Sequence, residues 1–163
     1  MKVLFIAFLL VLTSCASQKV SFSVKIKYPY CGGAKPTPEM QKGRLEPADS
    51  MSFGIIREGE LEVSQWLTLD SEGKWDGKLK AGNYFIFRED KTLTIEEIIK
   101  KHKLESSEMY NFKGEKCLEL WKKEADYSFT IQQNNDNKIS FDLQSKCYVG
   151  LKPCLEYIGP KVN

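Results

Sequence analysis

Short segments in which every second side chain is apolar restrict the fold of this chain more than any other feature of its sequence. The clearest is "VSFSVKIKY" at residues 20–28, whose apolar positions are Val20, Phe22, Val24, Ile26 and Tyr28. A period of two is the repeat of a β-strand that buries one face and exposes the other. Near the end of the chain, "DYSFTIQ" and "KISFDL" repeat this pattern. We therefore expect a protein built mainly from half-buried strands.

Turn residues separate the predicted strands. Pro29 ends the first strand, and the stretch 31–50 begins with several glycines and prolines, which predicts a loop. Further strands are expected at 51–56, 61–69 and 74–79 and again after a turn at Gly82. Asp70 can cap its own turn, and Gly73 can take the positive φ that closes a tight hairpin. "NNDN", between the last two strands, predicts another hairpin turn.

Two short helices are predicted as an insertion between strands, at about 93–125. Thr94 and Glu97 have the spacing of a capping box. One apolar stripe follows, and it consists of Ile95, Ile98 and Ile99. We expect His102, at the next turn, to be a polar helix-end residue rather than a ligand or a base. The second helix, "EKCLELWKKEA", has Cys117, Leu120 and Trp121 at helical spacing.

These elements predict an all-β fold, because helices do not alternate with strands as a parallel sheet would require. About seven short strands with turns between them are typical of a sandwich of two sheets. We expect a single domain at 20–163, which carries the helical insertion and ends in an irregular tail.

The first residues form a separate unit. An unbroken apolar run, "VLFIAFLLVL", covers residues 3–12. As a helix it would rise about 15 Å, roughly half the thickness of a bilayer core, so it suits the apolar region of a secretory signal better than a membrane span.

The run leads directly into Leu12-Thr13-Ser14-Cys15, which resembles the bacterial lipobox. The resemblance implies cleavage before Cys15, a signal peptide at 1–14, and a diacylglycerol thioether on the Cys15 sulfur. Two or more acyl chains would anchor the protein stably, with 15–20 as a short tether. By resemblance to known lipoprotein sorting, Ala16, rather than an aspartate, favours an outer membrane over an inner one if the cell has both. The expected location is the cell envelope.

Lipid on Cys15 leaves an even set of cysteines: Cys31, Cys117, Cys147 and Cys154. In an exported protein we expect two disulfides, and the sequence leaves all three pairings open. They would tie the C-terminal tail to the body. The alternative is a thiol- or metal-binding protein that uses the same four residues. The spacing does not favour it, because zinc and redox sites usually place two cysteines two to four residues apart.

The stretch 61–87, "LEVSQWLTLDSEGKWDGKLKAGNYFIF", resembles the carboxypeptidase regulatory-like, or prealbumin-like, domain. The pattern of that family falls on Thr68, Gly73, Trp75, Leu79, Gly82 and Tyr84, with Leu69 as an extra residue. The resemblance implies a prealbumin-like or immunoglobulin-like sandwich in which Trp75, Leu79 and Tyr84 face one core. Tyr84 is placed like a corner tyrosine, whose hydroxyl bonds to loop backbone. "YCGGAKPTPE" and "KPCLEYIGP" resemble segments of small bacterial envelope lipoproteins.

No catalytic pattern is present in the sequence. The chain has one histidine and no G-x-S-x-G motif, so no nucleophile–base pair can be assigned. The 24 basic side chains are nearly balanced by 22 acidic ones, which gives no electrostatic argument for nucleic acid. We expect no enzyme activity, no cofactor and no metal. The predicted function is a lipid-anchored binding or structural module.

Clustered tyrosines are the candidate binding surface. Tyr28, Tyr30 and Tyr157, beside the loop at 31–33, would give rigid contact area at low entropic cost. The possible partner is an envelope protein or a glycan. The alternative is that these rings only pack the tail against the sandwich.

Overall fold

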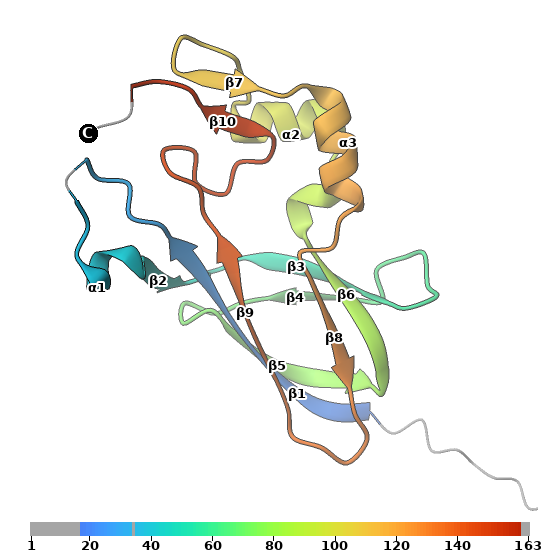
Figure 1. The fold of residues 1–163 in the computed structure, drawn as a ribbon. Coiled ribbons are helices and arrows are strands. Elements are labelled where there is room, and N and C mark those ends of the chain that lie inside the picture. Colours follow the sequence, from blue (N-terminus) through green and yellow to red (C-terminus); the bar gives the residue numbers. More distant parts are fainter. Residues whose placement is uncertain (1–16, 34, 161–163) are drawn as a thin grey trace, which may run out of the picture.

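The computed structural model describes residues 17–33 and 35–160, so the signal peptide and Cys15 lie outside the described residues. The elements follow one another along the chain (Figure 1) as β1 (Ser17–Tyr28), α1 (Pro38–Gln41), β2 (Arg44–Pro47), β3 (Ser52–Arg57), β4 (Gln65–Thr68), β5 (Lys74–Lys80), β6 (Gly82–Arg88), η1 (Glu89–Thr92), α2 (Ile95–His102), β7 (Tyr110–Phe112), α3 (Glu115–Lys123), β8 (Tyr127–Ile131), β9 (Asn137–Gln144) and β10 (Leu155–Tyr157). Among the described residues, no helix has the length and apolar character needed to cross a bilayer.

Two four-stranded sheets form the body of the protein and confirm the predicted all-β sandwich. In the first sheet, β1 pairs with β2 and β5 along one edge and with β9 along the other. The pairing of β1 with β9 is parallel, whereas the pairings with β2 and β5 are antiparallel. The second sheet is antiparallel, in the order β4-β3-β6-β8.

The core between the sheets is built by the alternating positions. In β1 the side chains of Val20, Phe22 and Val24 are at most 2% exposed. The Phe22 ring lies 5.1 Å from the ring of Phe129 on β8, in an edge-to-face arrangement that joins the two sheets. Trp75 packs against the same core. The predicted alternation of buried and outward-facing side chains is therefore confirmed for β1.

The predicted hairpins at 70–73 and 134–137 are wrong, although both turns form. Asp70 Oδ1 accepts hydrogen bonds from the backbone N–H groups of Glu72 and Lys74, and Gly73 has φ +71°. The flanking strands, β4 and β5, belong to different sheets, and so do β8 and β9. Each of these turns therefore carries the chain across the sandwich. Turn residues indicate where the chain reverses direction, but they do not indicate with which strand the next strand pairs.

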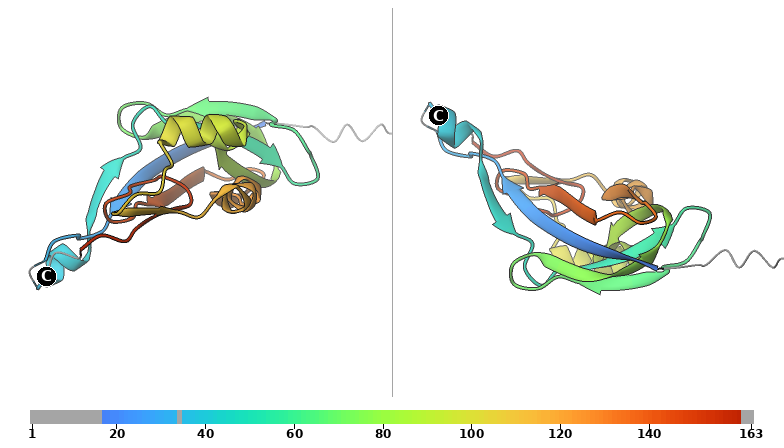
Figure 2. Two further views of the ribbon diagram at one scale, coloured as in Figure 1. Left: turned by 90° about the horizontal axis from the view of Figure 1, so that it is seen from above. Right: turned by 90° about the horizontal axis from the view of Figure 1, so that it is seen from below.

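A smaller layer covers one end of the sandwich and has its own core (Figures 1 and 2). It contains α2, α3 and the two-stranded pair β7–β10. Its buried residues are Ile98, Leu104, Leu118, Val149, Cys154 and Leu155. Both predicted helices are present, and the Thr94–Glu97 capping box is formed. In α3 the buried leucine is Leu118, whereas Leu120, which we expected on the apolar face, is 62% exposed.

Three segments differ from the sequence prediction. The predicted loop at 31–50 contains α1 and β2, and the Thr37 side chain caps α1. The strand predicted at 61–69 is reduced to β4, because 61–64 form the bend of a real β3–β4 hairpin. The tail, predicted as irregular, contributes β10, which pairs with β7.

Candidate functional site

Two disulfides fix the end of the molecule where the smaller layer meets β1 and β9. Cys31 is bonded to Cys147, and Cys117 is bonded to Cys154, with Cα–Cα distances of 5.5 Å and 5.9 Å. The first joins the chain just after β1 to the chain just after β9. The second joins α3 to the residue before β10. Two disulfides and a tied tail are thus confirmed, and the pairing that the sequence left open is resolved.

Both disulfides line one pocket, with a volume of about 720 Å³. Its walls come from the loop after β1, from α3, from the β9–β10 connection and from β10 itself. The lining residues are Cys31, Gly32, Lys113, Cys117, Leu120, Trp121, Glu124, Lys146, Cys147, Tyr148, Val149, Cys154, Leu155, Glu156 and Tyr157. Segments distant in the sequence therefore meet here, and two covalent bonds hold them together.

Two tyrosine rings lie against each other in this pocket. The ring centroids of Tyr148 and Tyr157 are 4.3 Å apart, and Tyr110 packs its edge on Tyr157 at 5.6 Å. The Tyr148 hydroxyl donates a hydrogen bond to the Cys31 carbonyl at 2.6 Å. The Tyr157 hydroxyl donates to the Pro160 carbonyl at 3.0 Å. Both rings are therefore held in defined positions.

The backbone at the pocket adopts a conformation that costs energy. Tyr148 has φ +66° and Cys154 has φ +52°, in the left-handed region that non-glycine residues seldom occupy. Such a conformation costs on the order of 1–3 kcal/mol and persists only where the surroundings impose it. Tyr148 follows a disulfide-bonded cysteine, and Cys154 is itself disulfide-bonded. The cross-links therefore stabilise the strained pocket wall.

Charges at the pocket are balanced. Lys113 and Lys146 line it together with Glu124 and Glu156. The Lys113 ammonium lies 3.1 Å from the Glu156 carboxylate, and both side chains are about half exposed. The lining thus combines aromatic and aliphatic side chains with no excess of either charge.

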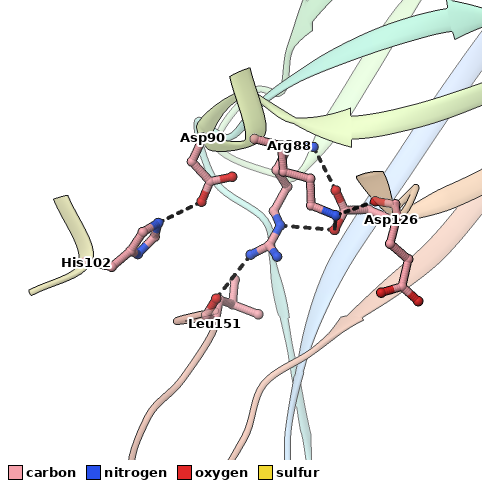
Figure 3. Close-up of polar contacts among 7 residues, drawn as sticks. Arg88, Asp90, His102, Asp126 and Leu151 are labelled. Atoms are coloured by element: carbon pink, nitrogen blue, oxygen red, sulfur yellow. Dashed lines mark hydrogen bonds and ion pairs between the residues drawn. The ribbon is translucent and has the colours of Figure 1, made fainter. Parts of the chain in front are cut away.

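Beneath the pocket, a buried ionic cluster positions Trp121. Asp126 lies 3.2 Å from Arg88 and 3.1 Å from Lys91, and all three side chains are at most 10% exposed. The guanidinium of Arg88 lies 5.1 Å from the centroid of the Trp121 ring, and the Lys91 ammonium 4.8 Å from it. Burial lowers the pKa of the Lys91 ammonium despite the attraction of Asp126. Figure 3 shows Arg88 between Asp126 and the carbonyl of Leu151, to which it donates at 3.2 Å.

A second pair lies beside this cluster (Figure 3). His102 Nε2 is 2.8 Å from Asp90 Oδ2, and the other carboxylate oxygen of Asp90 is buried with no hydrogen-bond partner among the described residues. Burial by itself would raise the pKa of Asp90. The hydrogen bond from His102 and the positive charges of Arg88, His102 and Lys101 outweigh it and lower this pKa. His102 thus lies at the end of α2, as expected, with a structural partner.

The structure divides the three predicted tyrosines between two hollows. Tyr157 lines the large pocket, whereas Tyr28 and Tyr30 line a separate hollow of about 320 Å³ with Met40. Cys31 lines both. Tyr28 also packs against the main core, and the Arg44 guanidinium lies 5.3 Å from its ring centroid. The three residues therefore do not form one surface.

Sequence reasoning missed Tyr148 and Trp121 as pocket residues. Tyr148 directly follows Cys147, so adjacency to a disulfide was an available signal. Trp121 had been identified only as part of a helix face, and nothing local to α3 indicates that the tail would pack opposite it. Within the described part of the chain, no group of three or more His, Cys, Asp or Glu side chains is arranged to hold a metal ion.

Comparison with protein-family models, with curated proteins and with solved structures finds no match to this chain. The feature of the chain that bears most directly on its function is the pocket that its two disulfides line.

Proposed function

We propose that this protein is a lipid-anchored, non-catalytic binding module of the bacterial cell envelope, and that the disulfide-lined pocket is its ligand site. The observation that carries the proposal is that both disulfides lie in the wall of one aromatic-lined pocket. A volume of about 720 Å³ lies within the range of small-ligand sites, roughly 300–1,000 Å³.

Pre-organisation supports binding at this place. Ordering loops and side chains costs free energy when a ligand binds, and cross-links that fix them beforehand reduce this cost. Here the disulfides fix the backbone, and hydrogen bonds fix the tyrosine rings. A disulfide that served only to stabilise the fold could lie anywhere in the protein, whereas both of these disulfides line the pocket.

The lining favours a ligand that is neutral overall and has an apolar face. Trp121, Tyr148 and Tyr157 offer aromatic area, and the balanced lysines and glutamates at the pocket can hydrogen-bond to polar groups. A glycan segment and a short peptide segment of an envelope protein share this chemistry, and the experiment below distinguishes them.

The position of the lipid anchor supports a location of the pocket at the end of the domain that points away from the membrane. Ser17, where β1 begins, is two residues after Cys15. β1 then runs for 12 residues, whose first and last Cα atoms are about 36 Å apart at a rise of 3.3 Å per step, before the chain reaches Cys31 in the pocket wall. With acyl chains on Cys15, the pocket would face the periplasm or the outside, consistent with the expected outer-membrane location.

Tryptophan fluorescence tests the proposal directly. The chain has three tryptophans, and of these Trp121 lines the pocket whereas Trp66 is 47% exposed on β4. Titration with glycan fragments, and separately with peptides from envelope proteins, should change the emission of the wild type and of Trp66→Phe. The change should disappear in Trp121→Phe.

Binding by the Tyr157→Ala variant, at an unchanged melting temperature, would contradict the proposed site. Tyr127→Ala, with the ring outside the pocket, is the matched control. A separate intact-mass measurement with labelled fatty acid reports acylation, which Cys15→Ser should abolish.

A further inference from the structure

We propose that Lys19, Lys78 and Lys80 form a contact site for anionic phospholipid headgroups of the membrane that holds the anchor. This inference rests on the acylation of Cys15 in the proposed function and adds a second, electrostatic contact to it. No pocket residue takes part, so the site is distinct from the ligand pocket.

The pairing of β1 with β5 places the three lysines together. Lys19 is directly opposite Lys78, and Ser17 is directly opposite Lys80. Their neighbours Val20 and Leu79 point into the core, so the lysines share the outer face of the sheet. All three are exposed. They therefore form one basic patch at the end of the sheet where β1 begins.

Like charges directly opposite each other destabilise an antiparallel pair. Two other lysines of this sheet have acidic partners, since Lys74 is 2.6 Å from Glu72 and Lys138 is 2.6 Å from Asp136. Within residues 17–33 and 35–160, no ion pair involves the three lysines of the patch. The next acidic residue on β5, Asp76, accepts a hydrogen bond from Ser21 at 2.5 Å. The patch thus has positive charge to offer to an external anion.

The anchor brings such an anion close. Two residues of extended chain span at most about 7 Å, so an acylated Cys15 would hold Ser17 at the level of the lipid headgroups. Lys80 lies across from Ser17, and Lys19 is two residues further along β1. Lysine side chains at this distance are within the range over which an anionic leaflet attracts positive charge.

Acidic residues in a loop of the second sheet indicate which face of the domain turns toward the membrane. The β3–β4 loop carries Glu58, Glu60 and Glu62 and lies at the same end of the molecule as the start of β1 (Figures 1 and 2). The side chain of Arg57, where this loop begins, donates a hydrogen bond to the carbonyl of Ala81 in the β5–β6 turn. An anionic surface would attract the β1–β5 face and repel this loop, so we infer that the β1–β5 face inclines toward the membrane.

The test uses the full acylated protein in two kinds of vesicle, phosphatidylcholine alone and phosphatidylcholine with phosphatidylglycerol. Each lysine is labelled with an amine-reactive reagent and quantified by mass spectrometry. Labelling of Lys19, Lys78 and Lys80 should fall about five-fold in the anionic vesicles and recover at high salt. Lys25 and Lys27, on the same face of β1 but at its far end, should label equally in both.

The outcomes separate the two proposals. Acylated protein whose patch lysines label equally in both vesicles overturns the headgroup contact and leaves the anchor standing. Protein of unmodified mass that does not float with either vesicle overturns the anchor, and the contact with it.

Discussion

Nε of Arg88, at the end of β6, lies 3.2 Å from Oδ1 of Asp126, just before β8, and neither side chain is more than 10% exposed. The same carboxylate lies 3.1 Å from Lys91, and its Oδ2 accepts from the Arg88 backbone N–H at 2.8 Å. One acidic group thus compensates two buried cations at the junction of the sandwich and the smaller layer.

Replacing Asp126 with Asn should therefore destabilise the protein by about 3–5 kcal/mol, because two buried cations lose their counter-ion. Urea unfolding measures this free energy. Glu46→Gln is the matched control, since the Arg44–Glu46 pair is exposed and should contribute less than about 1 kcal/mol. Equal effects of the two substitutions would contradict the stabilising role of the buried cluster.

Each disulfide should stabilise the fold according to the length of chain that it closes. The chain-entropy relation gives about 5 kcal/mol for Cys31–Cys147, at a separation of 116, and about 4 kcal/mol for Cys117–Cys154, at a separation of 37. Double Cys→Ser variants and chemical unfolding measure these contributions. Non-reducing peptide mapping checks the pairing, and a peptide with Cys147 linked to Cys154 would contradict it.

Asp90 should make stability fall in acid. In the folded state the pKa of Asp90 is lowered below the ordinary value of 3.8. As the pH falls, the unfolded chain therefore binds a proton at Asp90 before the folded protein does, and unfolding is favoured. The contribution is complete above about pH 5 and is lost as the pH falls through 3.8 toward the folded pKa. Unfolding free energies from pH 5 to pH 2 should fall more steeply for the wild type than for Asp90→Asn. Parallel profiles would argue against this role of Asp90.

Removing the Tyr84 hydroxyl should cost about 1 kcal/mol, the net value of a typical hydrogen bond. This hydroxyl donates to the Lys80 carbonyl at 2.8 Å, and the ring is buried. Burial also raises the pKa of the Tyr84 phenol, partly offset by Arg57. Thermal unfolding of Tyr84→Phe measures the loss. Tyr127→Phe, with a half-exposed ring stacked on Phe141, should leave the stability nearly unchanged.

Local features of the sequence predicted local features of the structure. The alternation in β1, the Thr94–Glu97 cap and the Tyr84 hydroxyl bond each depend on residues a few positions apart. The Gly73 turn also formed as expected, and there an added Cβ would lie 2.4 Å from the Val24 carbonyl oxygen. These features are encoded by spacing, so a single sequence is enough to find them.

Pairing over long distances could not be predicted in this way. Val20 of β1 lies beside Asn137 of β9, and no sequence feature near either residue indicates that the two are paired. The same limit applies to the pocket, because Cys31, Trp121 and Tyr148 reach it from three separate segments. Two disulfides could be expected from the four cysteines that remain when Cys15 is assigned to the lipid. Their pairing depends on which strands lie side by side.

The parallel pairing of β1 with β9 also determines how the domain would carry mechanical load. Both strands run toward the pocket end, and shortly beyond their ends Cys31 and Cys147 are covalently joined. A pulling force between an anchored Ser17 end and a ligand held in the pocket at the far end would act along the direction of these two strands. The covalent backbone of β1 and the Cys31–Cys147 bond would carry this force, while the hydrogen bonds to β9 keep the two strands in register. The domain could thus serve as a stiff spacer between membrane and ligand.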